Sequence, residues 1–344
     1  MIGLLLEVTH EEVDVWAQIT TERMAKRPWL ETLMRWTARS GEHLLSSPER
    51  TLAAMDEGGV DIAFLSAWHG PEGDLISNEE VARQIDAAPT RFRGLASVDL
   101  HNPMAGVREI RRWVDGKTFV GVRVVPWLWD LPPNHRLYYP IYAACVDAGV
   151  PFCTQIGHTG PLKRSETGRL IPYLEDVLLD FPELVVVAGH VGFPWIDELV
   201  TLTVKFQNFY VDTSAYALHR LPPAFVAWMK GIGKNRAMFG TNWPILSITF
   251  CIIFSAFREP PVAAIRCSIP SCFSCRLPDT HVDQNSFALG KHRFIVPIPI
   301  ALYDFLGIMF LFHSQKVRKL RIAGQQLIPS RPAVIGQVIG AAVG

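Results

Sequence analysis

Residues 149–195 read GVPFCTQIGHTGPLKRSETGRLIPYLEDVLLDFPELVVVAGHVGFPW and decide the fold. Two short apolar runs in this stretch, 150–156 and 184–188, each lead into a histidine that follows a glycine. The first histidine is His158, in GHTG, and the second is His190, in GHVG. The repeat predicts two strands of the same kind, each ending in a polar group.

The segment between the two predicted strands has the pattern of an amphipathic helix. Residues 170–181 carry apolar side chains at helical spacing. Continuous apolar strands joined by helices are typical of a parallel sheet, because both faces of such a sheet are covered. In a (β/α)8 barrel the chemistry lies at the carboxyl ends of the strands. Two histidines in equivalent positions there predict a functional site, whereas a single one is more often structural.

Segments of the same two kinds alternate along the first 240 residues. The remaining predicted strands are 12–19, 60–66, 95–98, 119–125, 209–213 and 237–240, and the remaining predicted helices are 48–57, 78–88, 103–114, 138–148 and 224–229. Residues 23–45 are rich in helix formers, and 67–73 are predicted to be a loop. Eight strands alternating with helices favour a TIM barrel over an open doubly wound sheet. No glycine-rich dinucleotide or Walker motif is present, which argues against a nucleotide cofactor.

Composition narrows the class of protein. The chain has 344 residues, 49% of them hydrophobic and 19% charged, which is typical of a globular protein. The formal net charge of zero gives no support for a nucleic-acid partner or an acidic membrane surface. The amino-terminal residues lack the basic region of a signal peptide, so we expect reduced cysteines and a cytoplasmic location. The expected partner is a small-molecule substrate, with a homo-oligomer left open.

The composition changes abruptly near Pro244. Residues 245–344 contain ten lysines and arginines against four acidic residues, a net charge of +6, whereas the first 244 carry −6. All ten tryptophans precede this point and four of the six cysteines follow it. The break predicts a barrel domain at 1–246 and an atypical tail at 247–344. An altered reading frame or a gene-model error is the leading explanation for the tail, and a genuine appended module is the alternative.

Several segments resemble the amidohydrolase-related (amidohydrolase 2) family, which includes aminocarboxymuconate-semialdehyde decarboxylase. The segments are GVDIAFLS, RFRGLASVD, FVGVRVVPW, GHTGP, DFPELVVVAGHVGFPW, NFYVDTSAY and AMFGTNWP, in the family order. The resemblance covers about 12–246 and implies a TIM barrel whose closing helices are replaced by the unrelated tail. It also implies one divalent metal, often zinc, that polarises a carbonyl or lowers the pKa of a bound water to about 7.

The metal ligands that the resemblance implies are only partly present. His158 and His190 match the histidines expected after the fifth and sixth strands. The His-x-His pair of the first strand falls at Trp16 and Gln18, and the aspartate of the eighth strand falls at Asn242. Indole offers no lone pair to a metal, and the two amides are weak neutral donors, whereas catalytic zinc takes three good ligands. The expected metal site is therefore depleted.

A repurposed pocket is the alternative to a metal site. Asp212 or His69 would then act as the general base, while Asn242, Arg123 and the two histidines polarise a carbonyl group. Asp212 as a turn acid is the competing interpretation. Arg123 is predicted to face the barrel interior and hold a substrate carboxylate or phosphate. Trp127 is a candidate for substrate contact, although such tryptophans more often pack at the rim of the barrel. The histidines His101, His135 and His219 are assigned to surface loops.

Two features of the tail suggest further roles. Cys267, Cys272 and Cys275 have the spacing of a plant-type iron–sulfur loop, but the fourth cysteine is missing, so we assign the spacing to chance. Residues 294–312 are long enough to span a membrane, but they hold Asp304 and two prolines, so a membrane anchor is the minority interpretation.

The sequence leads to a hydrolase of the amidohydrolase superfamily as the first functional hypothesis. Its substrate would be a small carbonyl compound, an acid, an amide or a thioester, with a C–N, C–O or C–C bond cleaved. A catalytically inactive barrel that has lost its metal ligands is the second hypothesis. A decarboxylase of the same family is the third.

Overall fold

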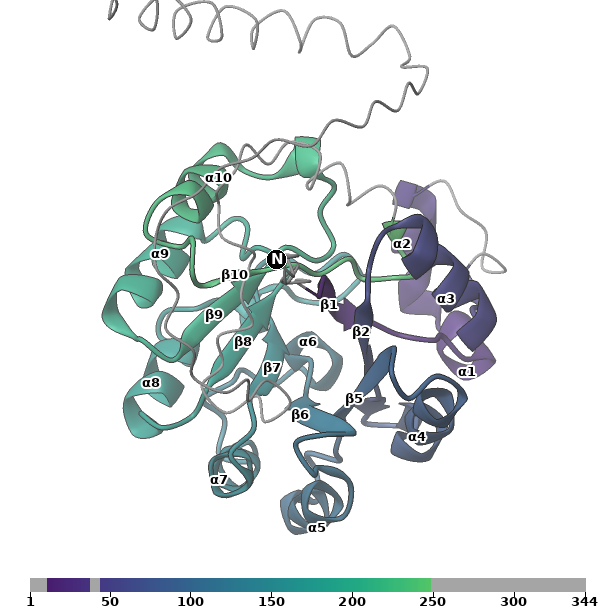
Figure 1. Cartoon of the computed structure of the whole chain (residues 1–344). Helices are drawn as coiled ribbons and strands as arrows, with labels where there is room; N and C mark the ends of the chain where they lie inside the picture. Colours follow the sequence, from purple (N-terminus) through teal and green to yellow (C-terminus); the bar gives the residue numbers. More distant parts are fainter. Residues whose placement is uncertain (1–10, 38–43, 249–344) are drawn as a thin grey trace, which may run out of the picture. The chain divides into compact units, whose positions relative to one another are not determined.

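The computed structural model describes residues 11–37 and 44–248, and the predictions for the tail after 248 lie outside these ranges. Eight parallel strands form a nearly closed barrel, with helices around its outside (Figure 1). In sheet order the strands are β1 Val13–Ala17, β2 Ile62–Ser66, β5 Phe92–Ala96, β6 Phe119–Arg123, β7 Phe152–Gln155, β8 Val186–Gly189, β9 Phe209–Asp212 and β10 Ala237–Met238. The predicted TIM barrel is confirmed.

The helices follow the strands in the expected alternation. They are α1 Glu22–Ala25, α2 Glu31–Thr37, α3 Pro48–Glu57, α4 Asn78–Ala87, α5 Pro103–Trp113, α6 Pro126–Trp129, α7 Tyr139–Ala148, α8 Tyr173–Asp180, α9 Ile196–Lys205 and α10 Pro223–Lys230. Within the described part of the chain, none has the length and apolar character that crossing a membrane requires.

Signals visible in the sequence begin and end several of these helices. The Ser47 hydroxyl accepts a hydrogen bond from the backbone amide of Arg50 at the start of α3. At the start of α4, Ser77 and Glu80 form a capping box, in which each side chain accepts from the other residue's amide. Helix α7 ends at Gly149, whose φ of 65° is a left-handed conformation that glycine adopts without steric cost.

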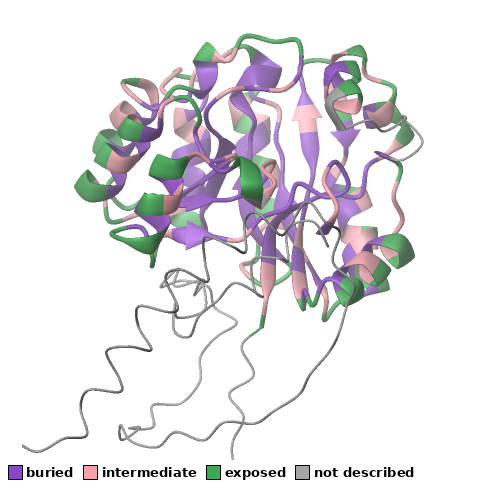
Figure 2. Ribbon diagram, turned by 90° about the horizontal axis from the view of Figure 1, so that it is seen from above, coloured by how far each residue is buried: buried purple, intermediate pink, exposed green. Residues whose placement is uncertain are grey.

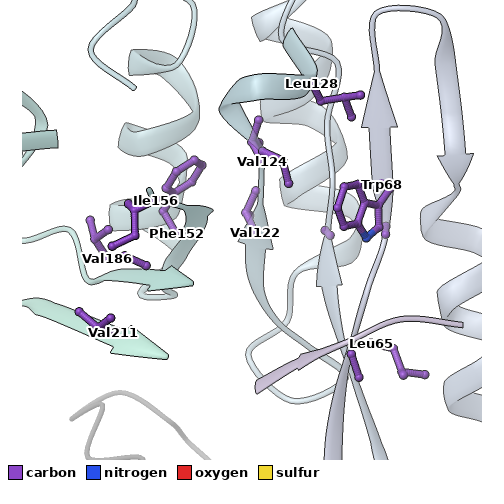
Figure 3. Packing of buried hydrophobic residues seen from close by; sticks show 14 of the residues in the cluster. Leu65, Trp68, Val122, Val124, Leu128, Phe152, Ile156, Val186 and Val211 are labelled. Atoms are coloured by element: carbon purple, nitrogen blue, oxygen red, sulfur yellow. The ribbon is translucent and has the colours of Figure 1, made fainter. Parts of the chain in front are cut away.

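Two hydrophobic layers fill the space on either side of the strands. The larger layer lies between the strands and the helices, and it contains the residues shown in Figure 3, Val122, Phe152, Val186 and Val211 among them. A smaller cluster fills the inside of the barrel; its members are Val15, Leu95, Val120, Cys153, Val187, Tyr210 and Met238. Successive strand residues alternate between the two layers, so the strands are buried on both faces, as Figure 2 shows. The sheet and its helices therefore hold the strand ends as a rigid rim.

Some local predictions differ from the structure. The predicted loop 67–73 is part of an antiparallel hairpin, β3 Trp68–Gly70 with β4 Gly73–Ile76, which extends above β2. The helix-rich stretch from residue 23 is interrupted by a 3-10 turn, Pro28–Leu30, because Pro28 cannot continue α1. Helices α6 and α9 were not anticipated. The last strand is shorter than predicted and ends at Met238.

Hydrogen bonds rather than a full ladder close the barrel between its first and last strands. The backbone amide of Asn242 donates to the carbonyl of Trp16 at 2.8 Å, and the amide of Gln18 donates to the carbonyl of Trp243 at 3.1 Å. The segment after β10 therefore lies directly beside β1. This closure places Asn242 beside Trp16 and Gln18, which lie 224 or more positions earlier in the sequence.

Candidate active site

A cavity of about 490 Å³ opens at the carboxyl ends of the strands, where a barrel enzyme carries its chemistry. Both aromatic and polar side chains line it. The indoles and the tyrosine come from Trp29, Trp68, Trp127 and Tyr216, and the polar groups come from His158, His190, His219, Arg220 and Asn242. The prediction that His158 and His190 share one site agrees with this geometry. The volume suits a small molecule.

On the β8–β9 side of the cavity, three side chains form a continuous hydrogen-bonded chain. His190 Nδ1 lies 2.7 Å from the Ser214 hydroxyl oxygen, which also accepts from the His190 backbone amide at 3.2 Å. The Ser214 hydroxyl in turn donates to Asp212 Oδ1. The chain links a fully buried carboxyl group to an imidazole at the cavity wall. Asp212 is therefore linked to the cavity through Ser214 and His190. It is not a base in direct contact with the cavity.

Burial sets the charge state of this chain. Removal from water, reinforced by the nearby positive charge of Arg123, lowers the pKa of His190 to about 3, so its imidazole is neutral near pH 7. Burial raises the pKa of Asp212, whereas the Ser214 hydrogen bond and Arg123 act in the opposite direction. A neutral imidazole with one nitrogen committed to Ser214 keeps its other nitrogen for the cavity.

On the β1–β10 side, the positions expected to hold metal ligands bind one another. Gln18 Nε2 donates to Asn242 Oδ1 at 3.1 Å and to the carbonyl of Trp243. Gln18 is fully buried and Asn242 is 6% exposed. The side-chain oxygen of Asn242 is thus occupied by the Gln18 amide, which makes it a poor metal ligand. The Asn242 Nδ2 group, a hydrogen-bond donor, is the one that could polarise a carbonyl group.

Trp16 and Arg123 occupy the middle of the barrel mouth beneath the cavity. The Arg123 guanidinium carbon lies 3.8 Å from the centre of the Trp16 ring, and one of its nitrogens donates to the carbonyl of Val15 at 2.8 Å. Arg123 is 1% exposed and does not line the cavity. It faces the barrel interior as predicted, but it stacks on Trp16 instead of reaching a position where it could hold a substrate.

A second buried acid lies at the base of the same region. Asp14 Oδ1 accepts from the backbone amides of Trp16 and Thr241, both at 3.0 Å, and its Oδ2 accepts from the Thr241 hydroxyl at 2.5 Å. Burial is the main influence and raises the pKa of Asp14 to about 7, against the opposing effect of these hydrogen bonds. No motif in the sequence singles out this residue.

The backbone is strained where the strands reach the cavity. His190, Val191, Ala215 and Asn242 have φ values of 74°, 66°, 64° and 66°, in the left-handed region that residues with a Cβ rarely adopt. Each such residue costs on the order of 1–3 kcal/mol, and such residues concentrate at functional sites. Their position after β8, β9 and β10 marks this rim as the functional end of the barrel.

The remaining predicted residues fall inside and outside the cavity. Trp127, 5% exposed, forms part of the wall and packs edge-on against Trp29 with ring centres 5.0 Å apart. His69 is not among the cavity residues; its Nδ1 lies 2.6 Å from Asp74 Oδ1, and its ring stacks on Trp129. His69 belongs to the hairpin β3–β4, which was predicted to be a loop, and its backbone amide donates to the Ser97 hydroxyl just after β5. A role for His69 as general base therefore has no support from its position.

Sequence reasoning missed three residues of the site. Ser214 follows Asp212 by two positions at the end of β9, so the pattern Asp-x-Ser was visible, but its bond to His190 joins residues 24 positions apart. His219, assigned to a surface loop, lies with Arg220 in a 3-10 turn after β9 and lines the cavity rim. A loop that folds back over the barrel mouth leaves no periodic signal in the sequence.

The donors in the described residues do not fit a divalent metal. Residues 11–37 and 44–248 contain no group of three or more histidine, cysteine, aspartate or glutamate side chains arranged to hold a metal ion. Trp16 places an indole where a donor was expected, with its ring centre 4.4 Å from that of His190. The Gln18 amide donates to Asn242 Oδ1, which leaves the neutral oxygen Gln18 Oε1 as the one amide oxygen of the pair without a hydrogen-bond partner among the described residues. The ligand set that the resemblance implied is therefore incomplete in three dimensions as well.

Comparison with known proteins gives consistent results. Residues 26–248 match the model of the Amidohydrolase family. The gamma-resorcylate decarboxylase of Polaromonas sp. (strain JS666 / ATCC BAA-500) is 25% identical over 266 residues, which is 60% of this chain and 79% of that protein. The matches favour the decarboxylase hypothesis over the hydrolase hypothesis.

Solved structures share the fold. An uncharacterized TIM-barrel protein from Bordetella bronchiseptica superposes with a TM-score of 0.61 at 22% identity, over 74% of this chain and 93% of that one. A 5-carboxyvanillate decarboxylase from Novosphingobium aromaticivorans DSM 12444 gives a TM-score of 0.55 at 18% identity, over 74% and 92%. That structure contains manganese and 4-hydroxy-3-methoxy-5-nitrobenzoic acid, so the expectation of zinc in particular is not supported.

Proposed function

The chain belongs to the amidohydrolase family, and we propose that it is a decarboxylase, a carbon–carbon lyase that releases carbon dioxide from a small aromatic carboxylic acid. One observation carries the proposal. The cavity combines walls of indole and phenol rings with a neutral histidine that is hydrogen-bonded through Ser214 to a buried carboxyl group. Decarboxylation of an aromatic acid needs a pocket that holds the substrate ring and a group that delivers a proton to it.

The aromatic walls would select and orient the substrate ring. Trp29 and Trp127 meet edge to face with ring centres 5.0 Å apart, and Trp68 lies 6.3 Å from Trp127. Aromatic rings prefer such tilted and edge-on neighbours, at about 0.5–1.5 kcal/mol per pair beyond the burial of area. Arg220 and His219 at the rim add positive charge and hydrogen-bond donors that attract a carboxylate. The pocket chemistry thus favours an aromatic acid.

The chain of His190, Ser214 and Asp212 would supply the proton. In the proposed step Asp212 is protonated and the Ser214 hydroxyl turns to donate to His190 Nδ1. The His190 Nε2 proton then moves to the ring carbon that bears the carboxylate, while the Ser214 proton moves to His190 Nδ1 and the Asp212 proton moves to Ser214. The bond between that carbon and the carboxylate then breaks, its electron pair returns to the ring, and carbon dioxide leaves. Burial raises the pKa of Asp212, which favours the protonated acid from which this relay starts. Positioned proton transfer of this kind contributes about 10²–10⁴-fold.

The apolar wall would assist the departure of carbon dioxide. A carboxylate loses strong hydration when it moves from water to a site lined by indoles. Neutral carbon dioxide is weakly hydrated and loses much less. No step in this scheme needs a metal ion. His158, which lines the same cavity, is proposed to contact the substrate carboxylate or a ring hydroxyl from the opposite side.

The direct test is turnover of aromatic acids by the purified protein. Gamma-resorcylate and 5-carboxyvanillate are the first compounds to use, with carbon dioxide and the decarboxylated ring as the measured products. In D₂O, the product is expected to carry deuterium at the carbon that lost the carboxylate. Cleavage of the corresponding amides or esters, with the acids left intact, would contradict the proposal and return the hydrolase hypothesis.

A non-catalytic barrel that binds the same acids is the second candidate. The neutral Gln18–Asn242 pair on the β1–β10 side favours it, because two expected ligand positions carry no charge. Quenching of tryptophan fluorescence measures binding separately from turnover. Saturable quenching with no product after prolonged incubation would favour this candidate over the decarboxylase.

A further inference from the structure

The centre of the barrel mouth holds a cation that belongs to the protein itself. Arg123, at the end of β6, is 1% exposed, and the central carbon of its guanidinium lies 3.8 Å from the centre of the Trp16 ring. A guanidinium keeps its charge in proteins even when buried. The contact with the indole face stabilises a desolvated cation.

The indole beneath this cation fills the space between two strand ends. Trp16 has no exposed surface. A Cβ placed on Gly189, at the end of β8, would lie 2.2 Å from Trp16 Cζ3 and 3.0 Å from Asp212 Oδ2. Trp16 therefore packs directly on the Gly189 backbone, beside the Asp212 carboxyl group and 4.4 Å from the His190 ring. No room is left there for an ion with its own coordination sphere.

The charges around Arg123 are the ones that a bound metal would otherwise balance. Asp14 and Asp212 are both fully buried, and both interact electrostatically with Arg123, without an ion pair in direct contact among the described residues. A buried carboxyl group that ionises without a nearby cation is strongly destabilised, so Arg123 is the charge that would compensate either acid in its ionised form. The single positive charge of Arg123 lies between β1 and β9, which carry these two acids.

We propose that the Arg123 guanidinium, held on the Trp16 indole, replaces a divalent metal as the fixed positive charge of this barrel, so that the folded protein binds no metal ion at its strand ends. Trp16 excludes the ion sterically, and the Gln18 amide occupies the side-chain oxygen of Asn242. The remaining oxygen, Gln18 Oε1, is one weak neutral donor. The inference concerns the cofactor and goes beyond the proposed reaction. The metal content of the protein tests it, and turnover does not.

Manganese is the probe for the test, because it prefers oxygen and imidazole ligands to the thiolates that Cys267, Cys272 and Cys275 would offer. The full-length protein is incubated with Mn²⁺, passed through a desalting column and analysed for manganese. We expect fewer than ~0.1 ions per chain, and no shift of the thermal midpoint in Mn²⁺. Near-stoichiometric manganese that His190→Ala or His158→Ala abolishes would overturn the proposal.

Restoring the donors supplies the positive arm. The combined variant Trp16→His, Gln18→His, Asn242→Asp is expected to bind about one Mn²⁺ per chain, because it provides the imidazole and carboxylate donors that such a site requires. Trp16→Phe is the matched control; it opens the same region without adding a donor and is expected to bind none. A folded combined variant that binds no manganese, or a Trp16→Phe protein that does, would contradict the role given to Trp16.

A variant that fails to fold leaves the wild-type result in force. Calorimetric titration of the wild-type protein with Mn²⁺ then decides alone: heat of binding that the His190→Ala protein lacks overturns the proposal, and its absence supports it. Because neither readout involves turnover, an inactive protein can still meet the prediction. An active decarboxylase that needs manganese would contradict the inference and leave the proposed function standing.

Discussion

The two sides of the barrel mouth have diverged in chemistry. On the β8–β9 side, His190, Ser214 and Asp212 form a hydrogen-bonded chain from the cavity to a buried acid. On the β1–β10 side, Gln18 and Asn242 form a neutral pair and the rest of the space is filled by Trp16. The contrast indicates that proton transfer and metal binding are separable functions of one strand-end rim. Among the described residues, the protein has side chains suited to proton transfer but no set of donors suited to a metal ion.

The largest expected effect lies on the β8–β9 side. His190→Ala removes the proposed proton donor, so kcat for a substrate acid is expected to fall about 10³-fold, within the range for positioned acid–base groups. The matched control is His101→Ala; His101 packs edge-on against Trp129, outside the cavity residues, and its loss should change kcat less than ~3-fold. Equal losses in the two variants would break the comparison.

The next effect tests the internal cation between the two sides. Arg123→Met leaves two buried carboxyl groups without their nearest positive charge, so the free energy of unfolding is expected to fall by about 3 kcal/mol. Urea denaturation measures it. The exposed Arg111 on α5 provides the control Arg111→Met, expected to change stability by less than ~0.5 kcal/mol. A stable Arg123→Met protein would show that Arg123 balances neither acid.

The β1–β10 side is expected to respond to pH through Asp14. Its pKa is raised from 3.8 to about 7, so the folded state holds a proton that the unfolded state releases between these values. The contribution of this group to stability is therefore largest at low pH and falls as pH rises from about 4 to 7, by about 4 kcal/mol.

Asp14→Asn should remove that share of the pH dependence. Its free energy of unfolding, measured at pH 5 and pH 8, is expected to differ less between the two conditions than that of the wild-type protein. Asp86→Asn on α4, which changes an exposed acid, is expected to keep the wild-type slope. An unchanged slope in Asp14→Asn would mean that Asp14 is ionised in the folded protein.

The smallest expected effect concerns Ser214. Ser214→Ala breaks the link between His190 and Asp212 but leaves both side chains in place, so kcat should fall about 10-fold, with a smaller change in KM. A structural role would not alter the tautomer of His190. The ¹⁵N chemical shifts of its ring should therefore change in the variant, and identical shifts would count against the hydrogen-bonded chain.

Local features of this chain could be predicted because they depend on near neighbours in the sequence. The serine caps of α3 and α4, the glycine that ends α7 and the alternating apolar strands are short-range patterns. The hairpin β3–β4 and helix α9 were missed. The strands of the hairpin are only three and four residues long, and α9 contains the β-branched residues Val200, Thr201, Thr203 and Val204, which have low helix propensity. The barrel itself followed from the repetition of one unit.

Only part of the candidate site could be predicted, because its contacts join residues that are far apart in the sequence. His158 and His190 were identified because each follows its own strand, and Trp16, Gln18 and Asn242 were identified as departures from a motif. That Gln18 binds Asn242 depends on barrel closure across 224 positions. Arg123 faced the interior as predicted, but only the packed structure shows that it meets an indole instead of a substrate.

The sequence by itself determined the barrel, the family and the residues at each strand end, since strand and helix periodicity is a local property and eight repeats of it specify one closed sheet. The tertiary structure alone decided which of those residues meet. Side-chain partners such as His190 with Ser214, and Trp16 with Arg123, come from different strands. Their distances depend on the register and closure of the whole barrel, which no single segment encodes.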